Sequence, residues 1–208
     1  MSVPSSLPQR IYLLAYDPAK GRVRMGTNLG AMLRAAALAE LYLSRHLADE
    51  RGRAVVGVLQ PCPDPVLAAT LEEIAGSWPR RWQTWVGRRQ GAAVKAVRRQ
   101  LGEEGWARLE NHKILGLFPT VKITLRDPRA RKELLGRVSG ALKQPVARVD
   151  PADAALAVIV AEGKLTLVLD RGTKRQHKQR LKDLAALSGP IGPALRKAIQ
   201  ASEAAAAG

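Results

Sequence analysis

The longest apolar pattern in the chain covers residues 29–47, LGAMLRAAALAELYLSRHL, and predicts a helix. Its apolar residues recur around most of the helix circumference, which is typical of a helix at the centre of a core. Thr27 or Asn28 is placed to cap its start. Arg34 lies inside this helix and keeps its charge, so it must meet a bound anion, a carboxylate or a route to water.

Shorter patterns on both sides of this helix predict a mainly α fold with one globular helical domain over residues 1–208. Apolar residues at helical spacing, with Pro or Asp near the start, indicate further helices, and apolar runs that end at Pro or Gly indicate strands. The expected helices cover residues 7–15, 64–74, 127–142, 151–169 with a break near Gly163, 170–182 and 194–201. The expected strands cover 22–25 and 54–59, and the tail 201–208 is expected to fray.

A β-hairpin is expected in the middle of the chain, from the β-type runs ARLENHKILGL and VKITLRD around a Phe-Pro-Thr turn. Its tip is apolar, whereas hairpin tips are normally polar. Two interpretations remain open, because such a tip can pack on a neighbouring subunit or on the core, and it can also insert into a bilayer interface. The tip residues concerned are Leu115, Leu117, Phe118 and Pro119.

The net charge of the chain indicates which kinds of molecule it binds. The chain has 34 Lys and Arg against 18 Asp and Glu, a formal net charge of +16, which indicates a polyanionic partner such as nucleic acid or an anionic membrane surface. Cys62 is the single cysteine, so no intramolecular disulfide is possible, and a reducing cytoplasm is expected. The longest charge-free apolar run, residues 154–161, is far shorter than the roughly 20 residues of a membrane span.

The segment from residue 78 to residue 100 combines aromatic and basic residues. It holds three of the four tryptophans and seven Lys or Arg residues, and no acid occurs between Glu73 and Glu103. We expect Trp82 and Trp85 to pack in the core, because large aromatic side chains dominate cores. An acid-free basic run of this length seldom serves only solubility, so the segment is expected to face an anion.

Catalytic and metal-binding patterns are not found in the sequence. His46, His112 and His177 are isolated from one another and from Cys62, so no metal site is predicted. No nucleophile motif, phosphate-binding glycine loop or paired carboxylate arrangement for catalysis is found either. The sequence therefore predicts a binding protein that uses no cofactor and has no enzymatic activity.

Six further segments follow one another over nearly the whole length of the chain, namely IYLLAYDPAKGRVRMG, LRAAALAELYLSRHL, LGEEGW, ILGLFPTVKITLRDP, ALAVIVAEGKLTLVL and RLKDLAAL. In this order they resemble the Golgi phosphoprotein 3 family of phosphoinositide-binding coat adaptors, and in particular its bacterial members. The resemblance implies a mostly helical domain, a hairpin for self-association or membrane insertion, and a basic pocket for the headgroup of phosphatidylinositol 4-phosphate.

The family's lipid site transfers only in part. Its central-helix arginine falls on Arg34, and the tryptophan before that helix falls near Met25, which would supply apolar surface instead. The family's two other headgroup arginines fall on Gly91 and Val94. The nearest bases are Arg88, Lys95 and Arg98, and pairs of them share a helix face.

These features together predict a peripheral protein on the cytoplasmic, inner face of a membrane. It would bind anionic phospholipid headgroups through a basic face and the apolar hairpin tip, and homo-oligomers could form through the hairpin. The alternative is a nucleic-acid-binding protein that uses the Trp/Arg-rich segment or the basic segment GTKRQHKQRLKDL.

Overall fold

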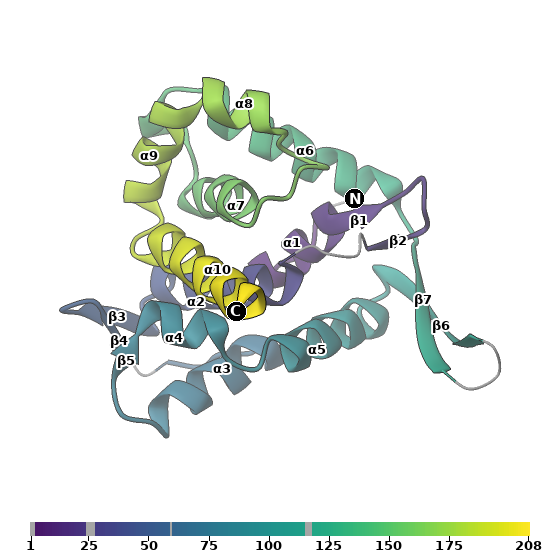
Figure 1. The fold of residues 1–208 in the computed structure, drawn as a ribbon, viewed down its shortest axis with the longest axis horizontal. Helices are drawn as coiled ribbons and strands as arrows, with labels where there is room; N and C mark the ends of the chain where they lie inside the picture. Colours follow the sequence, from purple (N-terminus) through teal and green to yellow (C-terminus); the bar gives the residue numbers. More distant parts are fainter. Residues whose placement is uncertain (1–2, 24–27, 59, 115–117) are drawn as a thin grey trace.

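The computed structural model describes residues 3–23, 28–58, 60–114 and 118–208, with side chains described outside residues 111–121. Within this part of the chain the fold is mainly α, as predicted, with small antiparallel sheets (Figure 1). The helices are α1 (Leu7–Ala15), α2 (Leu29–Leu43), α3 (Pro65–Ala75), α4 (Trp82–Gly87), α5 (Gln90–Glu103), α6 (Pro128–Lys143), α7 (Pro151–Glu162), α8 (Arg171–Gln176), α9 (Lys178–Leu187) and α10 (Ile191–Ala207), with the short 3-10 helix η1 (Val146–Arg148). The strands are β1 (Tyr16–Asp17), β2 (Arg22–Val23), β3 (Leu47–Glu50), β4 (Arg53–Val56), β5 (Arg80–Arg81), β6 (Ala107–Ile114) and β7 (Phe118–Leu125).

Helix α2 is the centre of the core, as its all-round apolar pattern predicts. It packs against α1, α3, α4, α5, α7 and α10, and only Gly30, Glu40 and its last two residues keep appreciable exposure. The predicted end at Leu47 is wrong. Arg45 takes a left-handed conformation with φ 64°, which turns the chain back, and Leu47 instead pairs with Val56 in the β3–β4 hairpin.

Three helices begin at an Asp-Pro pair, and in each the aspartate accepts hydrogen bonds from the first turn. Asp64 caps α3, Asp127 caps α6 and Asp150 caps α7 through their side-chain oxygens. An Asp at this position satisfies backbone N–H groups that have no partner within the helix, and Pro already has the backbone angle of a first helical residue. The break predicted near Gly163 is confirmed, since α7 ends at Glu162. The continuation of this helix to residue 169 is wrong, because the next helix begins only at Arg171.

The basic segment from 78 to 100 is divided among three elements. Strand β5 adds to β4, α4 follows directly, and α5 begins after a break at Arg88 and Arg89, where Arg89 has φ 49°. Trp82 and Trp85 are buried in the core, which confirms the prediction for both. The break turns the two arginines away from a continuous helix and toward α3, which the next section describes.

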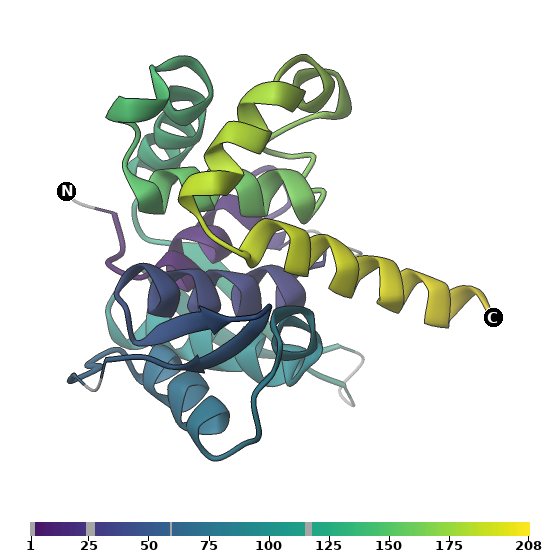
Figure 2. The same cartoon turned by 90° about the vertical axis from the view of Figure 1, so that its left-hand side faces the viewer.

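The elements form two halves around α2. In the views of Figures 1 and 2, α8 and α9 lie at the top and α3, α4 and α5 lie at the bottom. The predicted β6–β7 hairpin is present, with Ala107 opposite Leu125, and it extends from the body of the molecule (Figure 1). The predicted turn at Phe-Pro-Thr is wrong, because Phe118 pairs with Ile114 and Thr120 pairs with His112 inside the two-stranded sheet. Among the described residues, no helix combines the length and the apolar character needed to cross a membrane.

Candidate anion-binding site

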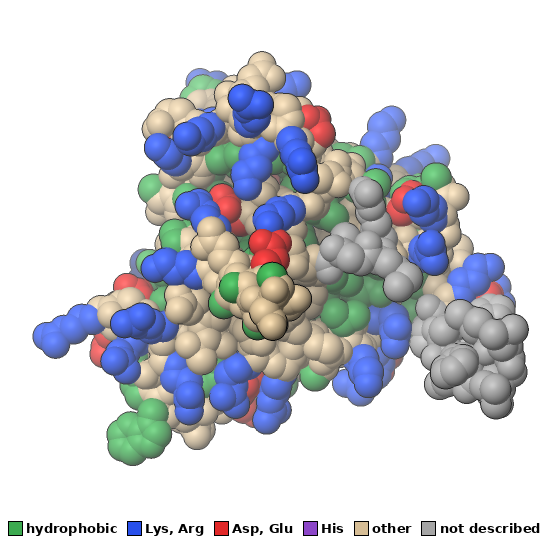
Figure 3. All heavy atoms as spheres, in the orientation of Figure 1, with side chains coloured by type: hydrophobic (Ala, Val, Ile, Leu, Met, Phe, Trp, Pro, Cys, Tyr) green, Lys and Arg blue, Asp and Glu red, His purple; other side chains and the backbone are tan. Residues whose placement is uncertain are grey.

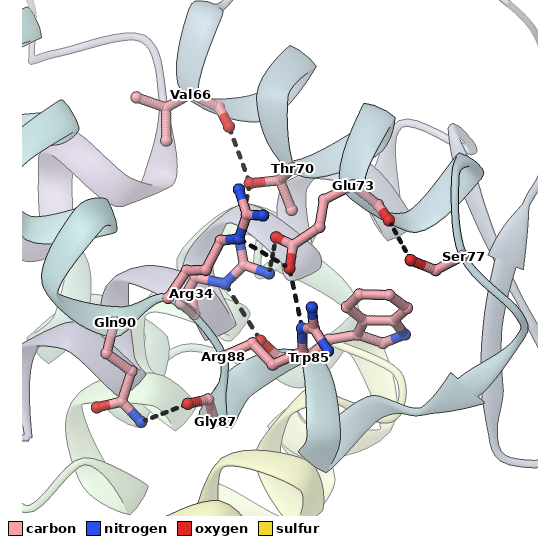
Figure 4. Close-up of polar contacts among 10 residues, drawn as sticks. Arg34, Val66, Thr70, Glu73, Ser77, Trp85, Gly87, Arg88 and Gln90 are labelled. Atoms are coloured by element: carbon pink, nitrogen blue, oxygen red, sulfur yellow. Dashed lines mark hydrogen bonds and ion pairs between the residues drawn. The ribbon is translucent and has the colours of Figure 1, made fainter.

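Arg34 is buried, and each of its three side-chain nitrogens donates a hydrogen bond to a protein group (Figure 4). Its Nε donates to the Trp85 carbonyl at 3.1 Å, one terminal nitrogen donates to Thr70 Oγ1 at 3.2 Å, and the other donates to Glu73 Oε2 at 2.9 Å. These acceptors come from α3 and α4, on opposite sides of the arginine. The side chain of Arg34 is therefore an interior link between α2, α3 and α4.

Glu73 is the shared acceptor of three arginines. Its second carboxylate oxygen accepts from Arg88 Nε at 3.0 Å and lies 3.6 Å from Arg89 Nε, while the first binds Arg34. Arg88 also lies over the Trp85 ring, with 5.6 Å between its guanidinium carbon and the ring centroid. One buried carboxylate thus faces three cations, so the cluster keeps a surplus of positive charge.

Burial and pairing act in opposite directions on the central arginine. Desolvation lowers the pKa of Arg34 below its ordinary value, and the Glu73 carboxylate raises it again. The side chains of Arg34 and Glu73 are only 5% and 8% exposed, so water screens this pair weakly. The pair therefore has the character of an internal ion pair, the second of the three environments that the sequence allowed for Arg34.

A cavity of about 170 Å³ lies beside this pair, between α3 and α5. Its charged groups are those of Arg34, Glu73, Arg89, Arg99 and Glu103, and the rest of the lining is small apolar side chains with Thr70 and Gln100. Arg99 and Glu103 are mostly exposed and approach each other to 3.6 Å. The arrangement can receive a small anionic group at the arginines, provided that this group competes with the Glu73 carboxylate.

The structure brings together two of the predicted headgroup residues, Arg34 and Arg88, on the carboxylate of Glu73. Lys95 is exposed on α5, and Arg98 is partly buried on the same helix, where its charge lowers the pKa of Tyr12 against the dominant effect of burial, which raises it. Neither Lys95 nor Arg98 lines the cavity beside Arg34.

The remaining predicted site residues belong to the segment around Met25 and to the hairpin tip. Met25, Leu115 and Leu117 lie outside the described residues, and Phe118 and Pro119 are described only as backbone at the start of β7. Their predicted roles in headgroup contact, membrane insertion or oligomerisation stay predictions. Within the part of the chain that the structure covers, no group of His, Cys, Asp and Glu side chains is arranged to hold a metal ion.

Two residues to which sequence reasoning gave no separate role are prominent in the structure. Glu73 pairs with the arginines of the cluster. The sequence feature that could have indicated this role is its position as the last acid before the acid-free run. Trp78 is 86% exposed, the most exposed large apolar side chain among the described residues, and it lies between α3 and β5. The exposure of Trp78 could not be read from the sequence, because Trp82 and Trp85 have similar neighbours and are buried.

The fold and this cluster define a basic, mainly α-helical protein with an internal arginine–carboxylate centre and a projecting β-hairpin. The family model of Golgi phosphoprotein 3 (GPP34) matches residues 7–202. The chain therefore belongs to the Golgi phosphoprotein 3 family, and the predicted family is confirmed. No curated protein matches the chain.

Proposed function

We propose that the protein is a peripheral, non-catalytic membrane protein that binds anionic phospholipid headgroups at the cytoplasmic face of a membrane. The observation that carries this proposal is Trp78, which is 86% exposed and is followed by Pro79 and the exposed Arg80 and Arg81. Tryptophan is favoured at the boundary between lipid and water, where its ring lies at the level of the headgroups. Neighbouring arginines would bind the lipid phosphates.

The positive charge around Trp78 also favours contact of this side of the molecule with a membrane. The exposed bases Arg89, Lys95 and Arg99 continue from β5 along α5, and Figure 3 shows Lys and Arg side chains along the lower edge of the molecule. Each base near an anionic membrane contributes about 1 kcal/mol, so a few of them would hold the protein reversibly. This set, with Arg80 and Arg81, is called the lower basic surface below.

The hairpin belongs to this proposal as a second contact. It projects from the body of the molecule, and in both views its described strands lie toward the same lower side as α3 and α5 (Figures 1 and 2). Its apolar tip would either insert into the bilayer or contact a second copy of the chain. Both roles are compatible with binding at the lower basic surface.

Membership of the Golgi phosphoprotein 3 family suggests phosphatidylinositol 4-phosphate as the lipid. Arg88 is placed to serve in such a site because its side chain is 40% exposed and can reach a headgroup while it still binds Glu73. Arg34 would take part only if a phosphate replaced Glu73 beside it, because protein acceptors engage its Nε and both of its terminal nitrogens in this structure.

Vesicle flotation tests the proposal with neutral vesicles, vesicles containing phosphatidylserine, and vesicles containing phosphatidylinositol 4-phosphate. We expect binding to both anionic kinds, release as salt rises, and severalfold weaker binding of Trp78→Ala. Arg80→Glu/Arg81→Glu should weaken binding by at least about 30-fold, because two bases at about 1 kcal/mol each are lost. The matched control is Lys132→Glu/Lys197→Glu, which changes the net charge equally at exposed positions on α6 and α10.

Three results would contradict this proposal. One is equal weakening by the two double variants, which would mean that total charge and not the lower basic surface decides binding. Another is unchanged vesicle affinity in Trp78→Ala. The third is tighter binding to DNA or RNA than to any vesicle at equal salt, which would favour the nucleic-acid alternative.

A further inference from the structure

A second basic surface lies on the other side of the molecule, around a groove of about 780 Å³ between α8, α9 and α10. Its floor is apolar and is formed by Val158 of α7, Leu181 and Ala185 of α9, and Ile199 of α10. The floor is continuous with the core, because Val158, Leu181 and Ile199 are buried while still lining the groove. Neither the Arg34 cluster nor the lower basic surface includes any of these residues.

One wall of the groove carries a row of cations. Arg171, Lys174, Arg175, Lys178 and Lys182 all line it. Arg171, Arg175, Lys178 and Lys182 follow one another at spacings of three or four residues, and Lys174 is next to Arg175. This spacing places side chains on one face of a helix, and the row continues across the bend between α8 and α9. The row therefore extends from the first residue of α8 to the second turn of α9.

The opposite wall neutralises only part of this charge. Glu162 binds Arg196 at 2.9 Å and lies 3.8 Å from Lys174, and Glu203 binds Lys164 at 2.5 Å. The seven bases that line the groove therefore face two acids, a surplus of five positive charges. Four of the bases have no carboxylate within ion-pair distance among the described residues, namely Arg171, Arg175, Lys178 and Lys182.

We propose that this groove binds an acidic, amphipathic segment of a partner protein. Apolar side chains on one side of such a segment would cover the floor between α9 and α10, and carboxylates along its edge would pair with the row on α8 and α9. The length of the row favours a chain of several carboxylates, because one phosphate group engages only two or three bases. The apolar floor has no counterpart in the backbone of a nucleic acid, which is charged throughout.

The groove lies apart from the surface that we propose for membrane binding. Helices α8 and α9 lie at the top of Figures 1 and 2, whereas α3 and α5 lie at the bottom. Figure 3 shows Lys and Arg side chains over the top of the molecule as well as along its lower edge. The groove and the lower basic surface therefore share no residue, and a partner in the groove would not compete with a membrane for the same side chains.

The test uses the full-length chain and a fluorescein-labelled synthetic peptide of about 18 residues, which makes about five helical turns. Leucines occupy helical i, i+3 and i+4 positions in this peptide and glutamates occupy most others. A scrambled peptide of the same composition keeps the charge and loses the apolar stripe. We expect fluorescence anisotropy to detect binding of the first peptide and at least about tenfold weaker binding of the scrambled one.

The decisive variant is Lys178→Glu/Lys182→Glu, which reverses two unpaired bases on the rim. It should weaken binding of the amphipathic peptide at least about tenfold, and the matched control Lys132→Glu/Lys197→Glu should weaken it less than about threefold. Ala185→Trp fills the floor without a change in charge and should also weaken binding. Thermal melts of all three variants report whether the fold is retained.

The proposal is overturned if the two double variants weaken binding equally, or if the scrambled peptide binds as tightly as the amphipathic one. It is also overturned if Lys178→Glu/Lys182→Glu loses affinity for anionic vesicles or single-stranded DNA but keeps its affinity for the peptide. In that case the groove would be a lipid or nucleic-acid surface. Vesicle binding by Lys178→Glu/Lys182→Glu that stays close to that of the control supports separate surfaces.

Discussion

Removal of Arg34 tests whether the internal ion pair is part of the stability of the fold. In Arg34→Ala, Glu73 stays on α3 and loses its most deeply buried partner, and the Trp85 carbonyl and Thr70 lose a donor. Breaking a buried ion pair from one side costs about 3 to 5 kcal/mol. Glu73 keeps Arg88 at 3.0 Å, so we expect a loss at the lower end, about 3 kcal/mol.

A loss of this size is easily measured. For a chain of this length, about 3 kcal/mol corresponds to a decrease in Tm of about 6 to 12 °C. The control is Arg99→Ala, which removes an arginine from a pair whose side chains are 72% and 64% exposed. An exposed pair of this kind contributes at most about 1 kcal/mol, so the control should melt within about 4 °C of the wild type.

The double variant Arg34→Met/Glu73→Leu completes the cycle. It removes both buried charges at similar volume, and such replacements are often neutral or stabilising, so it should recover most of the stability that Arg34→Ala loses. Urea titration of the wild type, Arg34→Met, Glu73→Leu and the double variant gives the coupling free energy.

One pattern of results would refute the structural interpretation of Arg34. If Arg34→Ala melts like the wild type and loses most of its affinity for phosphatidylinositol 4-phosphate vesicles, the arginine serves mainly as a headgroup ligand. Arg34→Lys should then weaken the affinity severalfold, because an ammonium keeps the charge but lacks the two-pronged donor of a guanidinium.

Two further predictions concern buried groups away from the anion sites. Burial raises the pKa of Glu40 to about 6 from 4.5, so its contribution to stability is largest below about pH 4.5 and is lost as pH rises through 6. Glu40→Gln keeps an acceptor for the Leu7 N–H, which binds Glu40 at 2.7 Å, and urea titrations should show a gain of up to about 2 kcal/mol near pH 7.5 and none near pH 4. A Cβ at Gly163 would lie 2.5 Å from Met32, so Gly163→Ala should cost about 1 to 3 kcal/mol, whereas Gly136→Ala, with open space around its Cβ inside α6, should gain about 0.5 to 1 kcal/mol in the same assay.

The sequence could predict the helix starts because their signals are local. An aspartate followed by proline satisfies free N–H groups and sets the first helical angle within three residues, and Asp64, Asp127 and Asp150 all behave in this way. The end of α2 was placed too late because Leu47 fits the apolar helical pattern. The turn depends instead on Arg45, a residue type that seldom takes a left-handed conformation.

The partner of Arg34 could not be predicted, because its choice depends on packing over a long separation in sequence. Glu40 lies on the same helix but six residues away, which places it on a different face from Arg34. The structure pairs Glu40 with the start of α1 and pairs Arg34 with Glu73, 39 residues along the chain. A pattern along one helix shows that a buried charge needs a partner, but only the packing of α2 against α3 selects which acid provides it.

A net charge of +16 does not by itself distinguish a membrane partner from a protein or a nucleic acid. The neighbouring apolar surface makes that distinction. At the lower basic surface the apolar group is Trp78, which projects into solvent beside arginines and so suits an interface that it can enter. In the groove the apolar side chains are recessed below a row of bases on α8 and α9, and a partner must bring its own apolar side chains to reach them. The two surfaces therefore carry the same sign of charge but select different partners, because one presents its apolar group outward and the other holds it at the bottom of a groove.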